Sequence, residues 1–206
     1  MHPFRQIFQF KSFATRMSVY VLSFALVVFA VIIVLFYSYS REKVTDYAIK
    51  STHGQLYNTA IEINNLLQTV ETTMYQSVWT IEESLNDPDS LYRIIAAVAE
   101  NNDLIESSGI AFEPYYYKTK EKYFMPYVSV INKKTEYSLL GSQSYDYPCM
   151  DWYLIPKLLK QDYWSEPYYD QGGGNFIMST YSLPLLDKEG KVYAIFTANI
   201  SLSRFT

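Results

Sequence analysis

The feature that most constrains the fold is an apolar run near the N-terminus. Residues 17–40 of the 206-residue chain read MSVYVLSFALVVFAVIIVLFYSYS and contain no charged side chain. A helix that crosses the hydrocarbon core of a bilayer needs about 20 predominantly apolar residues. We therefore predict a cytoplasmic segment at residues 1–16, a transmembrane helix at residues 17–40 and an extracytoplasmic domain at residues 41–206.

A cleaved signal peptide is the alternative, because Ser38 and Ser40 form a pair of small residues separated by one position. The apolar run is longer than the roughly 7–15 residues of a signal-peptide core, which favours a retained anchor. Basic residues flank the run on both sides, so they do not orient the helix by themselves. The leading segment has no acidic residue, whereas Glu42 and Asp46 follow the run. We therefore place the N-terminus in the cytoplasm, with one crossing of the inner (plasma) membrane.

A long helix is predicted after the apolar run, because residues 41–85 contain no proline and carry an apolar stripe at helical spacing. The stripe alternates steps of three and four residues and consists of Ala60, Ile63, Leu67, Val70, Met74, Ser77 and Ile81. We expect this stalk helix to continue the membrane span. After Ala60 we favour packing of the stripe on the domain's own sheet over a coiled-coil seam. Both can hold on different faces, and we expect a homodimer through the stalk.

The second half of the chain has the pattern of an antiparallel sheet. A short helix at residues 91–100, with Asp89 or Ser90 as its N-cap, precedes short runs rich in β-branched and aromatic residues. The predicted strands are residues 108–112, 127–131, 137–140, 175–186 and 191–202. A further helix is predicted at residues 150–160, where Pro156 should end or kink its regular part. Residues 164–174 are predicted to be poor in regular structure, and the fold class is α+β.

Composition excludes several functions. The net charge of −4 and the pI near 5.2 argue against a nucleic-acid partner. The chain has one cysteine, Cys149, and two histidines, which are too few ligands for a Cys/His zinc site. Ion sites made of carboxylates alone are not excluded by this count. No phosphate-binding glycine loop, nucleophile elbow or metalloprotease helix occurs. We therefore predict no metal, no cofactor and no catalytic residues, and we expect that the chain is not an enzyme.

The order of motifs resembles an extracytoplasmic Cache domain over about residues 41–204. The motifs are Gly-Ile-Ala-Phe in a strand, Asp151-Trp152-Tyr153, Trp164-x-x-Pro167-Tyr168-x-Asp170, an Asp-x-x-Gly turn, and a last strand that ends Ala198-Asn199-Ile200-Ser201-Leu202. The resemblance implies a PAS-like fold, in which a long N-terminal helix lies along a central antiparallel sheet. It also implies a bacterial receptor that senses small molecules, such as a chemoreceptor or a sensor kinase.

The resemblance to amino-acid-binding double Cache domains implies a ligand site. Its expected residues are Tyr145, Met150, Trp152, Tyr153, Trp164, Tyr168, Asp170 and Asn199. Met150 stands where the family has an arginine that binds the ligand carboxylate, and Asn199 stands where it has an aspartate that binds the amine. Loss of the arginine removes a hydrogen bond to a charged group, typically worth about 1.5–3 kcal/mol. The resemblance therefore implies a less charged ligand than an α-amino acid, or a degenerate pocket that binds none.

Together these observations predict a membrane-anchored sensory domain that binds a small organic ligand for transmembrane signal transduction. The alternative is an anchored protein-interaction or structural module without a small-molecule ligand. Aromatic rings that converge on a concave site favour the first, whereas rings spread over one flat face favour the second. Neither a second membrane span nor a signalling domain follows residue 206, so we expect a truncated receptor whose second sensor module and output domain are missing from this chain. The alternative is action through an associated chain.

Overall fold

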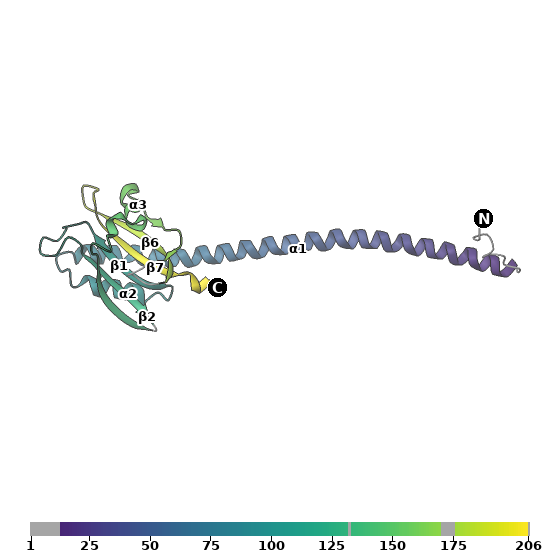
Figure 1. The fold of residues 1–206 in the computed structure, drawn as a ribbon, viewed down its shortest axis with the longest axis horizontal. Coiled ribbons are helices and arrows are strands. Elements are labelled where there is room, and N and C mark those ends of the chain that lie inside the picture. Colours follow the sequence, from purple (N-terminus) through teal and green to yellow (C-terminus); the bar gives the residue numbers. More distant parts are fainter. Residues whose placement is uncertain (1–12, 132, 170–175, 206) are drawn as a thin grey trace, which may run out of the picture. The chain divides into compact units, whose positions relative to one another are not determined.

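The computed structural model describes residues 13–131, 133–169 and 176–205 (Figure 1). Its helices are α1 (Phe13–Glu83), α2 (Leu91–Glu100) and α3 (Asp151–Leu159), with two short 3₁₀ helices, η1 (Tyr147–Cys149) and η2 (Leu202–Phe205). The chain divides into two compact units, Met1–Ile61 and Glu62–Thr206. Asp170, one of the expected site residues, lies outside the described residues.

The described part of the first unit consists of α1. This helix has 71 residues and is continuous across the boundary between the units, which confirms the predicted continuity of apolar run and stalk. Its segment Phe13–Arg41 has a mean hydropathy of 3.1 over its most apolar window, none of which is buried. A helix of this length and composition is able to cross a membrane.

The second unit is built on one antiparallel sheet. Its strands are β1 (Ile105–Phe112), β2 (Met125–Ile131), β3 (Lys134–Leu140), β4 (Tyr163–Trp164), β5 (Tyr168–Tyr169), β6 (Ile177–Leu186) and β7 (Val192–Ser201). The strand order is β3-β2-β1-β7-β6-β4, and β5 also pairs with β6. The first and last strands, β1 and β7, therefore lie side by side in the middle of the sheet, where Ile110 pairs with Phe196. This arrangement confirms the predicted α+β fold class.

The turn between β6 and β7 follows from its sequence. Gly190 adopts a positive φ of 74°, which glycine accepts without strain. The Asp187 Oδ1 accepts hydrogen bonds from the backbone N–H groups of Glu189 and Lys191, both at 2.9 Å. These bonds fix the tight connection that brings β6 and β7 into register.

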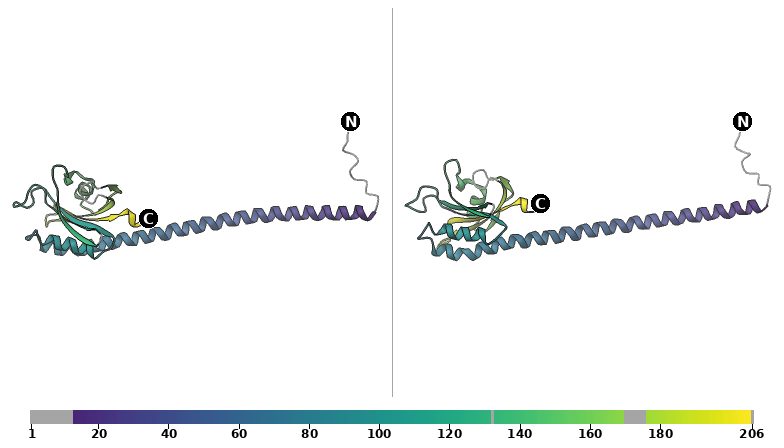
Figure 2. Two further views of the ribbon diagram at one scale, coloured as in Figure 1. Left: turned by 60° about the horizontal axis from the view of Figure 1, so that its bottom comes forward. Right: turned by 90° about the horizontal axis from the view of Figure 1, so that it is seen from below.

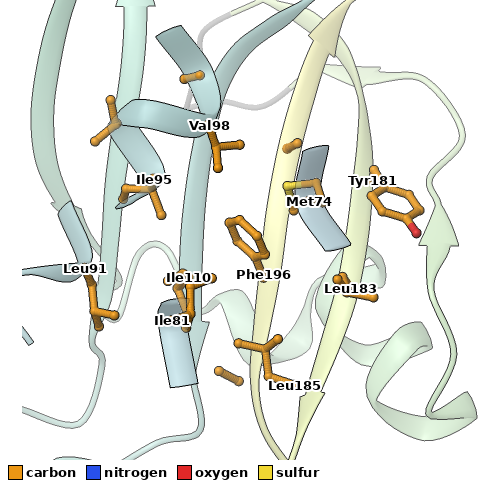
Figure 3. Packing of buried hydrophobic residues seen from close by; sticks show 14 of the residues in the cluster. Met74, Ile81, Leu91, Ile95, Val98, Ile110, Tyr181, Leu183, Leu185 and Phe196 are labelled. Carbon is orange, nitrogen blue, oxygen red and sulfur yellow. The ribbon is translucent and has the colours of Figure 1, made fainter. Parts of the chain in front are cut away.

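One face of the sheet is covered by α2 and by the part of α1 that belongs to the second unit, while α3 lies on the other face (Figure 2). Val70, Met74 and Ile81 of α1 are fully buried, and they belong to one hydrophobic cluster with the apolar face of α2 and with β1, β6 and β7 (Figure 3). This confirms that the stripe packs on the domain's own sheet from about Leu67 onward. Ala60 and Ile63, at the start of the stripe, are exposed.

The opposite face of the sheet carries a second hydrophobic cluster. It consists of Ala111, Met125, Tyr127, Tyr147, Trp152, Tyr153, Val192 and Ile195. All ten residues of β7 are buried, because helices and loops cover both faces of this strand. Because successive side chains of a strand point to opposite faces of the sheet, neighbouring residues of each central strand belong to different clusters.

Two local predictions differ from the structure. Ser90 is the N-cap residue of α2, but its backbone is already helical and its hydroxyl donates to the Asp87 carbonyl at 2.7 Å, so its side chain makes no capping hydrogen bond. Pro156 lies inside α3, whose end follows at Leu159 with Lys160 at a positive φ of 54°. The described part of the segment 164–174 is poor in regular structure, as predicted, and contains residues of the two-residue strands β4 and β5.

Candidate functional site

The candidate site lies between the sheet and the segments that cover its α3 side. A small inner cavity of about 10 Å³ is lined by Met125, Tyr127, Tyr145, Trp152, Tyr168, Thr180, Thr197 and Asn199. This volume is close to the smallest that can hold one water molecule. Every described side chain in this lining is uncharged.

A larger outer cleft of about 560 Å³ adjoins the inner cavity. Its described lining is Cys149, Met150, Asp151, Trp152, Tyr163, Ser165, Glu166, Pro167, Tyr168 and Tyr169. Trp152 and Tyr168 line both spaces and therefore stand at their boundary. The described lining of the outer cleft holds two carboxylates, Asp151 and Glu166, and no lysine or arginine.

Asn199 is the centre of a buried polar network beneath the inner cavity. Its Nδ2 donates to the Ser107 Oγ at 2.9 Å and to the Tyr127 hydroxyl at 3.2 Å, and its Oδ1 accepts from the Thr180 Oγ1 at 2.7 Å. Because the Thr180 hydroxyl donates to Asn199, the Tyr168 hydroxyl, 2.8 Å away, is the donor to the Thr180 Oγ1. Tyr168 is thus connected through Thr180 to the centre of the sheet.

The Trp152 indole is a hydrogen-bond donor without an acceptor. Its side chain is 4% exposed, and within the described part of the chain its Nε1 has no partner. Leaving a buried donor unpaired costs about 1–3 kcal/mol. Two other buried atoms share this property, the Ser182 Oγ and the Tyr193 hydroxyl, but neither residue is among the described lining of the two spaces. Trp152 is therefore the residue that both lines the two spaces and carries an unpaired buried N–H group.

Gly109 leaves space for two side chains that line the inner cavity. A Cβ at this position in β1 would lie 2.9 Å from the Tyr127 Cδ2 and 3.0 Å from the Met125 Cε. Both of these side chains line the inner cavity. A glycine inside a strand often marks such a close approach.

Four of the expected site residues surround the inner cavity. They are Tyr145, Trp152, Tyr168 and Asn199. Met150 lines the outer cleft, next to Trp152. The remaining two described residues, Tyr153 and Trp164, are not among the described lining of either space.

Tyr153 instead anchors α3. Its hydroxyl donates to the Glu113 Oε1 at 2.5 Å, and the Lys157 ammonium lies 2.7 Å from the same oxygen. Burial first, and then the hydrogen bond to Glu113, raises the pKa of Tyr153, so the phenol stays protonated. Glu113 follows β1 directly, and its backbone N–H donates to the Tyr193 carbonyl of β7. One turn of α3 is therefore tied to the central strands.

Trp164 lies on the other face of the sheet, in the cluster under α1. Its ring packs against Tyr181 with centroids 5.1 Å apart, and its Nε1 donates to the Glu71 Oε1 at 2.8 Å. The expectation of Trp164 as a wall of the ligand site therefore does not agree with its position.

Sequence reasoning missed several residues of the site, namely Ser107, Met125, Tyr127, Thr180 and Thr197. The signal for Thr197 was the alternation within the last predicted strand, because Thr197 stands two positions before Asn199. Residues at this spacing share one face of a strand. Ser107 and Met125 lie outside the predicted strands, which began at residues 108 and 127, so the prediction did not indicate them.

Comparisons with known proteins are consistent with this geometry. Residues 91–206 match the family model described as methyl-accepting chemotaxis protein-like, first PDC sensor domain. The chain is similar to the extracellular domain of soHK1S-Z6, a chain described as a histidine kinase, with 26% identity and a TM-score of 0.57 over 68% of this chain and 54% of that one. It shares the fold of the periplasmic sensory domain of the Campylobacter jejuni chemoreceptor Tlp1, with 12% identity and a TM-score of 0.57 over 70% of this chain and 57% of that one.

The chain spans little more than half the length of these two sensor domains. Among curated protein sequences, none shows significant similarity to it. The family model covers more than half of the 206 residues, including the whole sheet and α3. The predicted resemblance to a PAS-like sensor domain is confirmed, and the chain belongs to the family of methyl-accepting chemotaxis protein-like first PDC sensor domains.

Proposed function

We propose that this protein is a membrane-anchored sensor domain that binds a small organic molecule outside the cytoplasm and serves transmembrane signal transduction. The observation that carries the proposal is the position of Trp152, which lines both the inner cavity and the outer cleft and has an unpaired N–H group. Aromatic rings from α3, β2 and β5 converge there on a concave site rather than on a flat face. This arrangement supports a small-molecule site over a protein-interaction module.

The ligand of this site is a neutral or cationic molecule that carries a hydrogen-bond acceptor. The acceptor atom pairs with the Trp152 N–H, while the hydroxyls and the amide of the inner network serve its other polar groups. A carboxylate ligand would find no lysine or arginine in the described lining, and it would meet Asp151 and Glu166 at the outer cleft. Burying an ion without a partner is unfavourable.

Binding requires the inner cavity to widen, because about 10 Å³ does not accommodate an organic molecule. A ligand shifts the protein toward the wider arrangement only to the extent that it binds this arrangement better. Tyr168 is suited to move, since it belongs to a two-residue strand held by two residue pairs to β6.

The proposal places residues 1–16 in the cytoplasm, the span at residues 17–40 and the sensor beyond it. It also includes a homodimer through the stalk. Exposed apolar side chains on α1, such as Val44, Tyr47 and Leu56, support such a contact near the membrane.

A thermal-shift screen of the full chain in detergent micelles tests the function. Candidate ligands are amines, polyols and nucleobases, with α-amino acids and short carboxylic acids as the disfavoured classes. A ligand at about 100 times its Kd stabilises the fold by about 2.7 kcal/mol. We expect a neutral or cationic compound to raise the Tm.

The Trp152→Phe variant then separates the site from general stabilisation. It keeps an aromatic ring and removes the N–H, so we expect it to weaken binding of the compound by about tenfold. Trp79→Phe is the matched control, because Trp79 is an exposed residue of α1. Absence of any stabilising compound, or equal Kd values for Trp152→Phe and wild type, would contradict the proposal.

A further inference from the structure

The segment 163–169, which we call the edge segment, has two sides. Tyr163, Ser165 and Tyr168 line the outer cleft. Trp164 points the opposite way, as alternation along a strand requires, and its Nε1 donates to the Glu71 Oε1 of α1 at 2.8 Å. One short piece of chain thus contacts the ligand cleft on one side and α1 on the other.

A second connection lies beside the first. The Tyr181 hydroxyl donates to the Asp162 Oδ2 at 2.7 Å, immediately before the edge segment, and its ring contacts Trp164. The Tyr75 side chain of α1 also lies close to the Tyr181 phenol. Glu71 and Tyr75 stand four positions apart, so both lie on one face of α1. Two neighbouring side chains of α1 therefore face the start of the edge segment.

The edge segment is attached to β6, next to the end of the sheet, whereas the other wall of the cleft is tied to the central strands. Strand β4 has two residues and pairs only with β6 in the described sheet, through Tyr163 with Ser182 and Trp164 with Tyr181. Helix α3, which carries Trp152, is instead tied to the central strands through Tyr153 and Lys157. The hydrogen bond from Trp164 to the carboxylate of Glu71 is charge-assisted and therefore strong for its type.

We propose that the Trp164–Glu71 hydrogen bond couples the cleft wall to α1. When the edge segment moves to admit a ligand, the bond transfers the displacement to α1, the helix that also contains the apolar span. Trp164 and Glu71 are positioning residues in this scheme, since neither is among the described lining of the cleft. The inference rests on the proposed function, because it concerns the regulation of the same site.

Hydrogen exchange of the full chain in detergent micelles tests the coupling without any ligand. Tyr168→Ala perturbs the cleft wall by removing the bond to Thr180. We expect the variant to accelerate exchange of α1 amides around Glu71 and Tyr75 by about three- to tenfold, the range of a coupled pair. Met150→Ala, which alters the α3 side of the cleft, should leave these amides unchanged.

Breaking the link should abolish the response. In a Glu71→Ala background, and equally in Trp164→Phe, we expect Tyr168→Ala to leave the α1 amides at the rate of the background variant. Glu71→Gln keeps an acceptor oxygen and should restore the response, which a merely structural loss would not do. If Trp164→Phe fails to fold, Glu71→Ala carries the test, because Glu71 is only half-buried.

Two results would overturn the coupling. One is an unchanged α1 in the Tyr168→Ala variant, and the other is an equal acceleration with and without Glu71. Neither depends on the ligand screen. A ligand that is found while the exchange test fails refutes the coupling alone, whereas a failed screen refutes the proposed function.

Discussion

At the scale of single residues, Cys149 offers a chemical reporter at the cleft. The thiol is exposed and lines the outer cleft, and its Sγ donates to the Asp146 Oδ2 at 3.5 Å. This hydrogen bond, together with the negative charge of Asp146, raises the pKa of Cys149 above its ordinary value. The thiol therefore holds its proton to a higher pH and is a slower nucleophile near neutrality.

We expect Asp146→Asn to accelerate alkylation of Cys149 by iodoacetamide. Removing the carboxylate lowers the thiol pKa toward its ordinary value, so the rate-against-pH curve should move to lower pH over about pH 7–9. Mass spectrometry of the full chain gives the rate, and Cys149→Ser serves as the unreactive control. An unchanged curve would mean that Asp146 does not govern the thiol.

Gly109 provides a second prediction at this scale. An alanine Cβ would lie within 3.1 Å of the Tyr127 and Met125 side chains and of the Pro126 carbonyl. Such overpacking typically costs about 1–3 kcal/mol. We expect Gly109→Ala to lower the free energy of unfolding by that amount in urea. Gly54→Ala, where a Cβ meets nothing within 4 Å, should leave the unfolding of the sheet unchanged.

The sequence predicted part of the site, because residues at certain motif spacings lie on the same face of a helix or strand. The prediction failed for residues that are adjacent in sequence, because their side chains point in different directions. Trp152 and Tyr153 are consecutive on a helix, so only the first lines the cavity while the second contacts Glu113. Trp164 illustrates the same limit on a strand. The Trp152–Tyr153 pair in the motif does not reveal which ring faces the ligand.

At the scale of elements, α1 changes its surroundings along one stripe. Met74 is fully buried against the sheet, whereas Ile63, on the same stripe, is 38% exposed. The sequence pattern is uniform across both positions, so it predicted the helix but not the place where burial begins. The sheet itself determines that place, because it reaches only the last turns of the helix.

This difference predicts unequal effects of two similar truncations. Met74→Ala should reduce the free energy of unfolding by about 2–5 kcal/mol, since it leaves a cavity in the core. Ile63→Ala should change it by less than about 1 kcal/mol, because partly exposed side chains lose little burial. Urea denaturation followed by circular dichroism measures both. Similar losses for the two variants would indicate that Ile63 is buried in solution, for example against a second copy of the chain.

Among the strands, the long ones were predicted more accurately than the short ones. The long strands β6 and β7 were found within two residues of their ends, because β-branched and aromatic residues and the Asp-x-x-Gly turn mark them clearly. The strands β4 and β5 have two residues each and show no periodicity. Their pairing comes from contacts with β6 that no local pattern encodes.

At the scale of the whole molecule, the proposed topology makes a direct prediction. An alkaline phosphatase fusion after Thr206 should be active, because this enzyme matures only outside the cytoplasm, in an oxidising compartment. A fluorescent protein that folds only in the cytoplasm, fused at the same place, is the matched control and should stay dark. The reverse pattern would place the sensor in the cytoplasm and remove the proposed orientation.

The central pairing of β1 with β7 sets the order in which the domain is able to fold. Ser108 donates to the carbonyl of Thr197, which is 89 residues away in the sequence, and closing so long a loop slows folding. Until residues 192–201 have been synthesised, β1 cannot pair with β7, and the middle of the sheet is incomplete. A chain that emerges N-terminus first therefore cannot pair β1 with β7 until residues 192–201 have emerged. During that interval β1 and β6 expose unpaired edges, and this nascent form is the state in which the protein is most exposed to aggregation.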